Sequence, residues 1–187
     1  MEIAELKAEL EGLHVASFGW ALSCCRRDRA EAEDVLQSVY LKIFEGKARY
    51  RGESNLKTWL FAVIRKTALN ERRSRARRTL RAMIGLSRQS DGRLHHSEPY
   101  ADFERSERQQ KFLEALALLP PRQREVLHLV FYEDLSLSES ATVMGVSVGS
   151  ARQHYGRGKK RLRLAFEATE IDYGVSWERK QNSGAVS

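Results

Sequence analysis

One stretch of the chain, residues 119–163, carries the local signals of three short helices separated by tight turns. Pro120 and Pro121 open the first helix, because proline is tolerated where the first amide of a helix has no partner. Ser136 followed by Glu139 is typical of the capping box that starts a second helix. Because these helix-start signals lie so close together, residues 119–163 are predicted to form a small helical domain.

The third helix follows Gly145, a left-handed stop for the second helix, and Ser147 is its candidate cap. One side of this helix is apolar: Val148, Ala151, Tyr155 and Leu162. The other side carries hydrogen-bond donors and cations: Ser147, Ser150, Arg152, Gln153, Arg157 and Lys160. Arginine reads guanine or phosphate and glutamine reads adenine. A solvated basic face on an ordinary bundle is the alternative, but the order of caps, glycine turn and basic face favours a DNA-binding helix-turn-helix.

Two glycines inside this third helix do not fit a regular helix. Gly156 and Gly158 each cost about 1 kcal/mol relative to alanine at a helix interior. Either they allow a neighbouring backbone to come close, or the helix frays towards its end.

The composition favours an all-α globular protein with a polyanionic partner. The 187 residues carry a net charge of +7, and 42% are hydrophobic. Few stretches alternate with period two, so little sheet is expected. No apolar run approaches the roughly 18 residues of a membrane span, and no signal-peptide block opens the chain, so we expect a cytoplasmic protein without membrane insertion. The adjacent Cys24 and Cys25 lack further ligands at zinc spacing, so no metal or other cofactor is expected.

The N-terminal half contains two further helical patterns. Between residues 3 and about 25, apolar residues recur at helical spacing: Leu6, Leu10, Leu13, Phe18, Ala21 and Leu22. A second helix is predicted to start at Asp28 and end before Gly46, with one apolar stripe: Val35, Leu36, Val39, Tyr40 and Ile43. Its opposite face shows a polar patch around one exposed leucine: Asp34, Gln37, Ser38 and Leu41. Taken alone, this face is expected to be solvated.

A glycine-bounded basic loop, residues 46–54, precedes a third helix that Ser54 is expected to cap. The predicted core face of that helix is Leu56, Trp59, Leu60, Val63 and Ile64. The same helix then becomes strongly basic: Arg65, Lys66, Arg72, Arg73, Arg75, Arg77, Arg78 and Arg81. A charge run is usually a solvated face. Because this one continues a packed helix, it predicts a positioned phosphate-binding surface.

Two small helical domains joined by a flexible linker are therefore expected. The first covers residues 1–82, and the helical pattern lapses over residues 83–110, which are predicted to be the linker. The second domain is expected over residues 111–168, and residues 169–187 are predicted to be a mobile tail.

The residues of both halves resemble one family. Residues 32–44 (AEDVLQSVYLKIF) look like the region 2 helix of bacterial sigma-70-family factors, and residues 50–65 resemble the part that follows. Residues 119–127 (LPPRQREVL) resemble the start of region 4, and residues 136–163 its helix-turn-helix. The resemblance covers roughly residues 10 to 165, and the length fits the extracytoplasmic-function (ECF) subgroup, which has regions 2 and 4 alone.

The resemblance implies roles for the patterns above. The outer face with Asp34, Gln37, Ser38 and Leu41 would grip core RNA polymerase. The loop would hold a base flipped from the −10 element, with Tyr50, Arg51, Glu53, Ser54 and Asn55. The basic helix would track that strand, with Arg65, Lys66, Asn70, Arg72 and Arg73. The helix from Val148 would read the −35 element through the donors named above. The family often has Asn where Lys66 stands and Asp where Asn70 stands, which bears on the −10 sequence preference.

The expected function is thus a sigma factor that directs core polymerase to promoter DNA and helps to open the −10 region. By resemblance, an anti-sigma partner is also expected. The alternative is a free-standing helix-turn-helix regulator whose N-terminal half senses a signal or dimerises. An enzyme is disfavoured, since no catalytic constellation, phosphate loop or site for a small-molecule substrate is visible.

Overall fold

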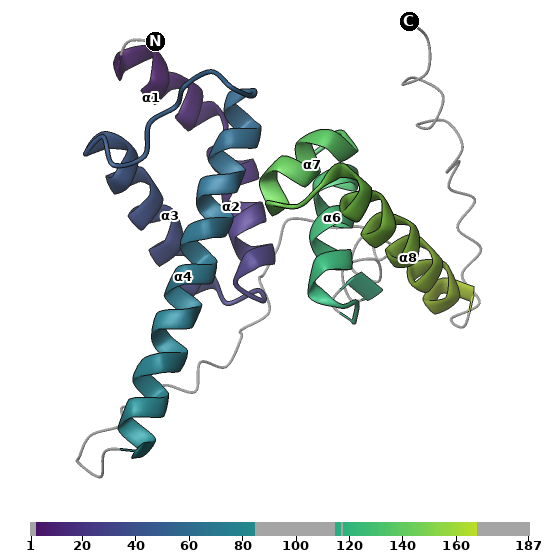
Figure 1. The fold of residues 1–187 in the computed structure, drawn as a ribbon. Helices are drawn as coiled ribbons and strands as arrows, with labels where there is room; N and C mark the ends of the chain where they lie inside the picture. The colour runs from purple at the N-terminus through teal and green to yellow at the C-terminus, as the bar shows by residue number, and fades with distance from the viewer. Residues whose placement is uncertain (1–2, 85–114, 117, 168–187) are drawn as a thin grey trace, which may run out of the picture.

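The computed structural model describes residues 3–84, 115–116 and 118–167, and within them every regular element is a helix (Figure 1). This confirms the predicted all-α class. The first two positions of the predicted linker, residues 83–110, are instead the end of a helix that runs to Ile84, and the rest of that linker lies outside the described residues, as does the predicted tail.

Four helices form the N-terminal unit: α1 (Ile3–Gly12), α2 (His14–Cys24), α3 (Arg29–Phe44) and α4 (Leu56–Ile84). The helical pattern expected over residues 3–25 is divided at Leu13 into α1 and α2. Asp28 caps α3 as predicted, because its carboxylate accepts a hydrogen bond from the Glu31 amide at 2.9 Å. The predicted stripe of α3 faces the core, where Val35 and Val39 are fully buried.

The centre of this unit is an aromatic residue that the sequence analysis did not single out. Trp20 on α2 is fully buried, and its indole N–H donates to the Phe61 carbonyl at 3.0 Å. The Trp20 ring stacks on the Phe61 ring at a centroid distance of 5.9 Å. Of the predicted α4 core face, Leu60 and Ile64 are fully buried. The buried side of α4 is therefore centred on Leu60, Phe61 and Ile64, and includes the unpredicted Phe61.

Three helices form the C-terminal unit: α6 (Pro121–Phe131), α7 (Leu137–Met144) and α8 (Val148–Glu167). The capping box is present, because Ser136 Oγ accepts from the Glu139 amide at 3.2 Å and Glu139 Oε2 accepts from the Ser136 amide at 2.9 Å. Gly145 ends α7 in the left-handed conformation, with φ 64°. The predicted helix-turn-helix is confirmed in its caps, turn and order.

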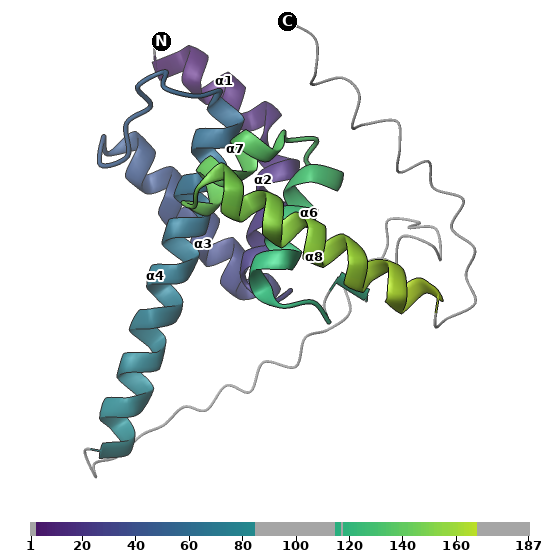
Figure 2. The same ribbon diagram turned by 45° about the vertical axis from the view of Figure 1, so that its right-hand side comes forward.

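The two units pack against each other. Helix α4 lies on α7 and α2 touches α6, so α7 fits beside the N-terminal half of α4 (Figures 1 and 2). The rest of α4 projects away from both bundles (Figure 2). Across the junction, the rings of Trp20 and His128 lie 5.4 Å apart.

Helix α8 crosses α6 closely at Gly158. A methyl group at this position would lie 3.0 Å from Leu127 Cδ1 and 3.2 Å from Gln123 Cβ, whereas Gly156 has open space around it. Of the two explanations for these glycines, close approach of a neighbouring helix therefore applies to Gly158, although the neighbouring atoms belong to side chains.

Alanine substitutions should separate the two glycines. Gly156→Ala should raise the free energy of unfolding by about 0.5–1 kcal/mol, because it removes only the entropic cost of glycine in a helix. Gly158→Ala should give a smaller gain or a loss, since Leu127 must shift to admit the methyl group. Urea unfolding followed by circular dichroism measures both. Equal stabilisation by the two variants would contradict the close packing of α8 on α6.

Candidate nucleic-acid interface

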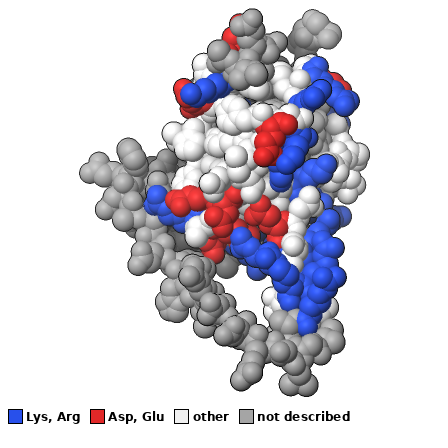
Figure 3. All heavy atoms as spheres, turned by 90° about the vertical axis from the view of Figure 1, so that its left-hand side faces the viewer, with Lys and Arg blue, Asp and Glu red and all other residues white. Residues whose placement is uncertain are grey.

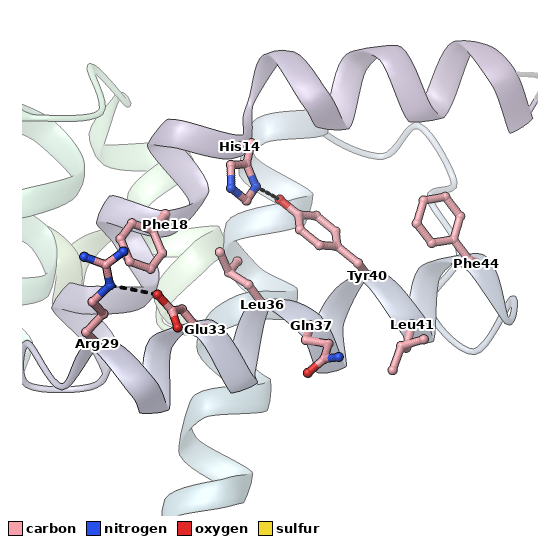
Figure 4. Close-up of a pocket in the computed structure, with 9 residues that line it drawn as sticks. All are labelled: His14, Phe18, Arg29, Glu33, Leu36, Gln37, Tyr40, Leu41 and Phe44. Carbon is pink, nitrogen blue, oxygen red and sulfur yellow. Dashed lines mark hydrogen bonds and ion pairs between the residues drawn. The ribbon is translucent and has the colours of Figure 1, made fainter. Parts of the chain in front are cut away.

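The outer face of α3 borders an apolar groove that it shares with α2. Gln37 and Leu41 are exposed, and Leu41 keeps 53% of its surface accessible. The groove has a volume of about 590 Å³ (Figure 4). Its lining residues are His14, Phe18, Arg29, Glu33, Leu36, Gln37, Tyr40, Leu41 and Phe44. An exposed apolar groove with a charged rim is a surface suited to a protein partner.

Two contacts shape this groove. His14 Nδ1 lies 3.1 Å from the Tyr40 hydroxyl, and Arg29 pairs with Glu33 at 2.8 Å (Figure 4). Phe44 was not among the predicted contacts, yet it is 54% exposed and lies at helical spacing after Leu41. The signal was present, because a second large apolar residue three positions after Leu41 falls on the same helix face.

The polar part of the α3 patch faces a second hollow, between α3 and α4. Asp34 is exposed there and Ser38 is half-buried. The hollow is lined by Asp34, Gln37, Ser38, Glu71, Arg75 and Arg78. The four predicted polymerase-contact residues thus lie together on α3, and Gln37 borders both hollows.

The loop before α4 is organised by Tyr50 and Asn55. The Tyr50 hydroxyl donates to the Ser54 carbonyl at 2.6 Å, and the Tyr50 ring lies 5.4 Å from that of Trp59. The prediction that Ser54 caps α4 is wrong. Asn55 is the cap, because its Oδ1 accepts from the Thr58 amide at 2.7 Å. Of the other predicted loop contacts, Arg51 and Glu53 are exposed.

The α4 residues predicted to track the −10 strand are of two kinds. Lys66, Asn70, Arg72 and Arg73 are exposed, as a strand-tracking surface requires. Arg65 is 8% exposed, and its guanidinium lies 3.2 Å from the Glu125 carboxylate of α6. The structure therefore brings four of these five side chains to the surface and pairs the fifth with the other unit.

Basic side chains run along one edge of the molecule, with an acidic group beside them (Figure 3). Arg75, on the projecting part of α4, pairs with Glu31 at 3.3 Å, and Glu71 borders the same hollow. The pair between Glu31 and Arg75 joins the start of the projection to α3, whereas Arg77, Arg78 and Arg81 beyond it are exposed. This arrangement leaves a cationic helix in position to follow a phosphate backbone.

The predicted recognition helix α8 presents its donors outward. Ser147 Oγ accepts from the Ser150 amide at 3.1 Å and caps the helix as predicted. The exposed residues of its outer side are Arg152, Gln153, Arg157 and Lys160. On the inner side, Ala151 and Leu162 are fully buried. The Lys159 amine lies over the Tyr155 ring at 5.3 Å, away from the outward row.

Three further observations concern metal ligands, the buried thiol and membrane spans. The described residues contain no group of three or more His, Cys, Asp or Glu side chains placed to hold a metal ion. Burial raises the pKa of the Cys25 thiol to about 12, so at neutral pH it is protonated and unreactive. Over the same ranges, no helix is long and apolar enough to cross a membrane.

Two family models match the chain. The model of sigma-70 region 2 matches residues 14–78, and the model of sigma-70 region 4 matches residues 109–162. Together the two matches cover well over half of the chain, in the order expected for a sigma factor. They support this interpretation over that of a free-standing regulator.

Named relatives agree with these matches. The chain is 29% identical over 145 residues to the RNA polymerase sigma-H factor of Pseudomonas aeruginosa, a match covering 75% of each chain. It is 27% identical over 166 residues to the ECF RNA polymerase sigma factor SigX of Bacillus subtilis, covering 86% of this chain and 84% of SigX.

Solved structures share the fold. The sigma factor RpoE of Bartonella quintana, solved in complex with the anti-sigma factor NepR, superimposes with a TM-score of 0.67 at 24% identity. That likeness covers 88% of this chain and 98% of RpoE. CnrH, solved in complex with the cytosolic domain of CnrY, has a TM-score of 0.57 at 20% identity, covering 87% of each chain. On the family matches and the named relatives, the chain belongs to the sigma-70 family of RNA polymerase sigma factors, in its extracytoplasmic-function group.

Proposed function

We propose that three surfaces of this sigma factor each bind a different target. The outer face of α3 binds core polymerase, and helix α8 reads the −35 element of the promoter. The loop before α4, together with α4 itself, engages the −10 element. The observation that carries the proposal is the coexistence of region 2 and region 4 matches with exposed donors on all three surfaces. The chain acts as an initiation factor in the cytoplasm, where polymerase works.

Polymerase binding uses Asp34, Gln37, Ser38 and Leu41, with the groove beside them. Apolar side chains that are exposed in the free chain gain most when a partner covers them, and Leu41 and Phe44 are such side chains. Asp34 and Gln37 on the rim supply orientation through polar contacts.

Promoter opening uses the loop before α4 and the exposed cations behind it. Extruding a base costs a few kcal/mol, so the flipped base needs a prepared site and the unpaired strand needs phosphate contacts. Tyr50, held by Ser54 and packed beside Trp59, is a rigid aromatic at the mouth of this site. Lys66, Arg72 and Arg73 follow along α4 at positions that can reach successive phosphates.

An anti-sigma factor is a further proposed partner. RpoE of Bartonella quintana has the same fold and was solved in complex with one. The exposed apolar groove on α2 and α3 gives such a partner a surface, and occupying it would compete with polymerase.

The proposal is tested by run-off transcription with purified core polymerase, with Asp34→Arg as the diagnostic variant. The native chain should support promoter-specific transcripts. Asp34→Arg should weaken core binding by about 2 kcal/mol, since it reverses a charge at an interface anchor, and transcript yield should fall accordingly. Fluorescence anisotropy with labelled chain measures the affinity.

The matched control is Glu9→Arg, which makes the same charge change at an exposed position of α1 outside both hollows. It should bind core polymerase like the native chain. If Asp34→Arg and Glu9→Arg bind equally well while circular dichroism shows both folded, the assignment of the α3 face is wrong. If the native chain yields no specific transcript, the function itself is contradicted.

Two substitutions on α8 should separate base reading from backbone contact. Arg157→Ala removes an exposed outward donor and should cost about 1–3 kcal/mol while changing the preference at one −35 position. Lys159→Met keeps the aliphatic stem over Tyr155 and removes only the charge, so it should weaken all sequences alike and flatten the salt dependence. Binding selection on randomised −35 DNA at fixed salt compares them. An unchanged sequence preference for Arg157→Ala would make Arg157 a backbone contact.

A further inference from the structure

The junction between the two units is a row of charged and polar pairs, here named the interdomain seam. Each pair joins a donor near or on α4 to a carboxylate of the C-terminal unit. Arg65 meets Glu125 at 3.2 Å, and the Lys57 amine lies 3.0 Å from the Glu133 carboxylate and 2.8 Å from the Glu133 carbonyl. The third pair is Asn55, whose amide donates to the Glu139 carboxylate.

The donors of the seam belong to the surface proposed to hold the −10 strand. Asn55 and Arg65 are among its predicted contacts, and Lys57 lies between them in the chain. A carboxylate and a phosphate present similar anionic oxygens to arginine and lysine. In this arrangement Glu125, Glu133 and Glu139 therefore sit where the anionic groups of the strand would be expected.

We propose that these three carboxylates form an intramolecular latch that masks the −10 surface with the chain's own region 4. The inference rests on the proposed function of the loop and α4. It adds that the free chain is autoinhibited, and that single-stranded DNA and region 4 compete for the same donors.

The spacing between the two promoter elements indicates that the two units must separate before both can bind DNA. The −10 and −35 elements are centred about 25 base pairs apart, or about 85 Å at 3.4 Å per base pair. We call the arrangement in this structure, with the two units packed together, the closed arrangement. In it Asn55 touches Glu139, and the eight residues from Glu139 to Ser147 span at most about 29 Å. The start of the recognition helix is thus held too close to the −10 loop for both surfaces to engage one straight duplex.

Buried polar atoms at the junction also favour separation of the two units. Thr58 Oγ1 on α4 and Ser140 Oγ on α7 are buried without a hydrogen-bond partner, and the packing of these two helices forms the junction. Buried polar groups without partners favour separation, because water satisfies them once the surfaces part.

The test uses the full chain with Glu125→Gln and Glu133→Gln combined, which removes two latch charges without touching a proposed DNA contact. The probe is a fluorescein-labelled single strand of mixed sequence, about 20 nucleotides long. The variant should bind it about tenfold more tightly than the control, because a larger fraction of the chain is open. The control is Glu11→Gln with Glu45→Gln, which removes two exposed carboxylates outside the seam and gives the same net charge.

Affinities within twofold of each other would overturn the latch, while run-off activity of the native chain would still uphold the sigma function. A variant that binds no single strand at all would overturn the latch together with the −10 assignment. A measurement on the unmodified chain guards against a variant that misfolds. Adding the single strand should accelerate hydrogen exchange at the amides of α7, since DNA displaces region 4. Unchanged or slower exchange there would contradict the competition.

Discussion

The buried indole of Trp20 is the contact on which the arrangement of the helices depends. It links α2 to α4 through its hydrogen bond to the Phe61 carbonyl and its stacking on the Phe61 ring, and it also meets His128 of the other unit. Truncating a buried aromatic of this kind costs about 3–5 kcal/mol. Because α4 carries both the −10 loop at its start and the cationic projection at its end, fixing α4 against Trp20 positions most of the proposed DNA surface.

The parts of the fold that could be predicted are those with local signals. The capping box of Ser136 and Glu139 and the cap at Asp28 depend on residues three positions apart, and both are present. The cap of α4 was assigned to Ser54 instead of Asn55, because adjacent residues of good capping types cannot be ranked without the backbone geometry. Helical periodicity likewise predicted the exposed faces of α3 and α8.

The interdomain seam could not have been predicted in this way. Arg65 and Glu125 are 60 positions apart, and Lys57 and Glu133 are 76 apart, so no periodic pattern connects them. In the sequence, Arg65 belongs to a run of basic residues that predicts a DNA-binding surface. The structure adds that in the closed arrangement this cation is buried against a carboxylate. In the proposed latch, Arg65 can therefore pair either with the Glu125 carboxylate or with a phosphate of the −10 strand. The equilibrium between these two states would control access of DNA to this surface.

The central claim is that the two units separate when this chain works as a sigma factor. The most direct measurement is energy transfer between dyes attached at Glu11 on α1 and at the exposed Leu164 on α8, in the free chain and with core polymerase and promoter DNA. We predict high transfer in the free chain and a marked fall when both partners are added. Equal transfer efficiency in the two states would contradict the account, because the units would then remain packed while the chain is engaged.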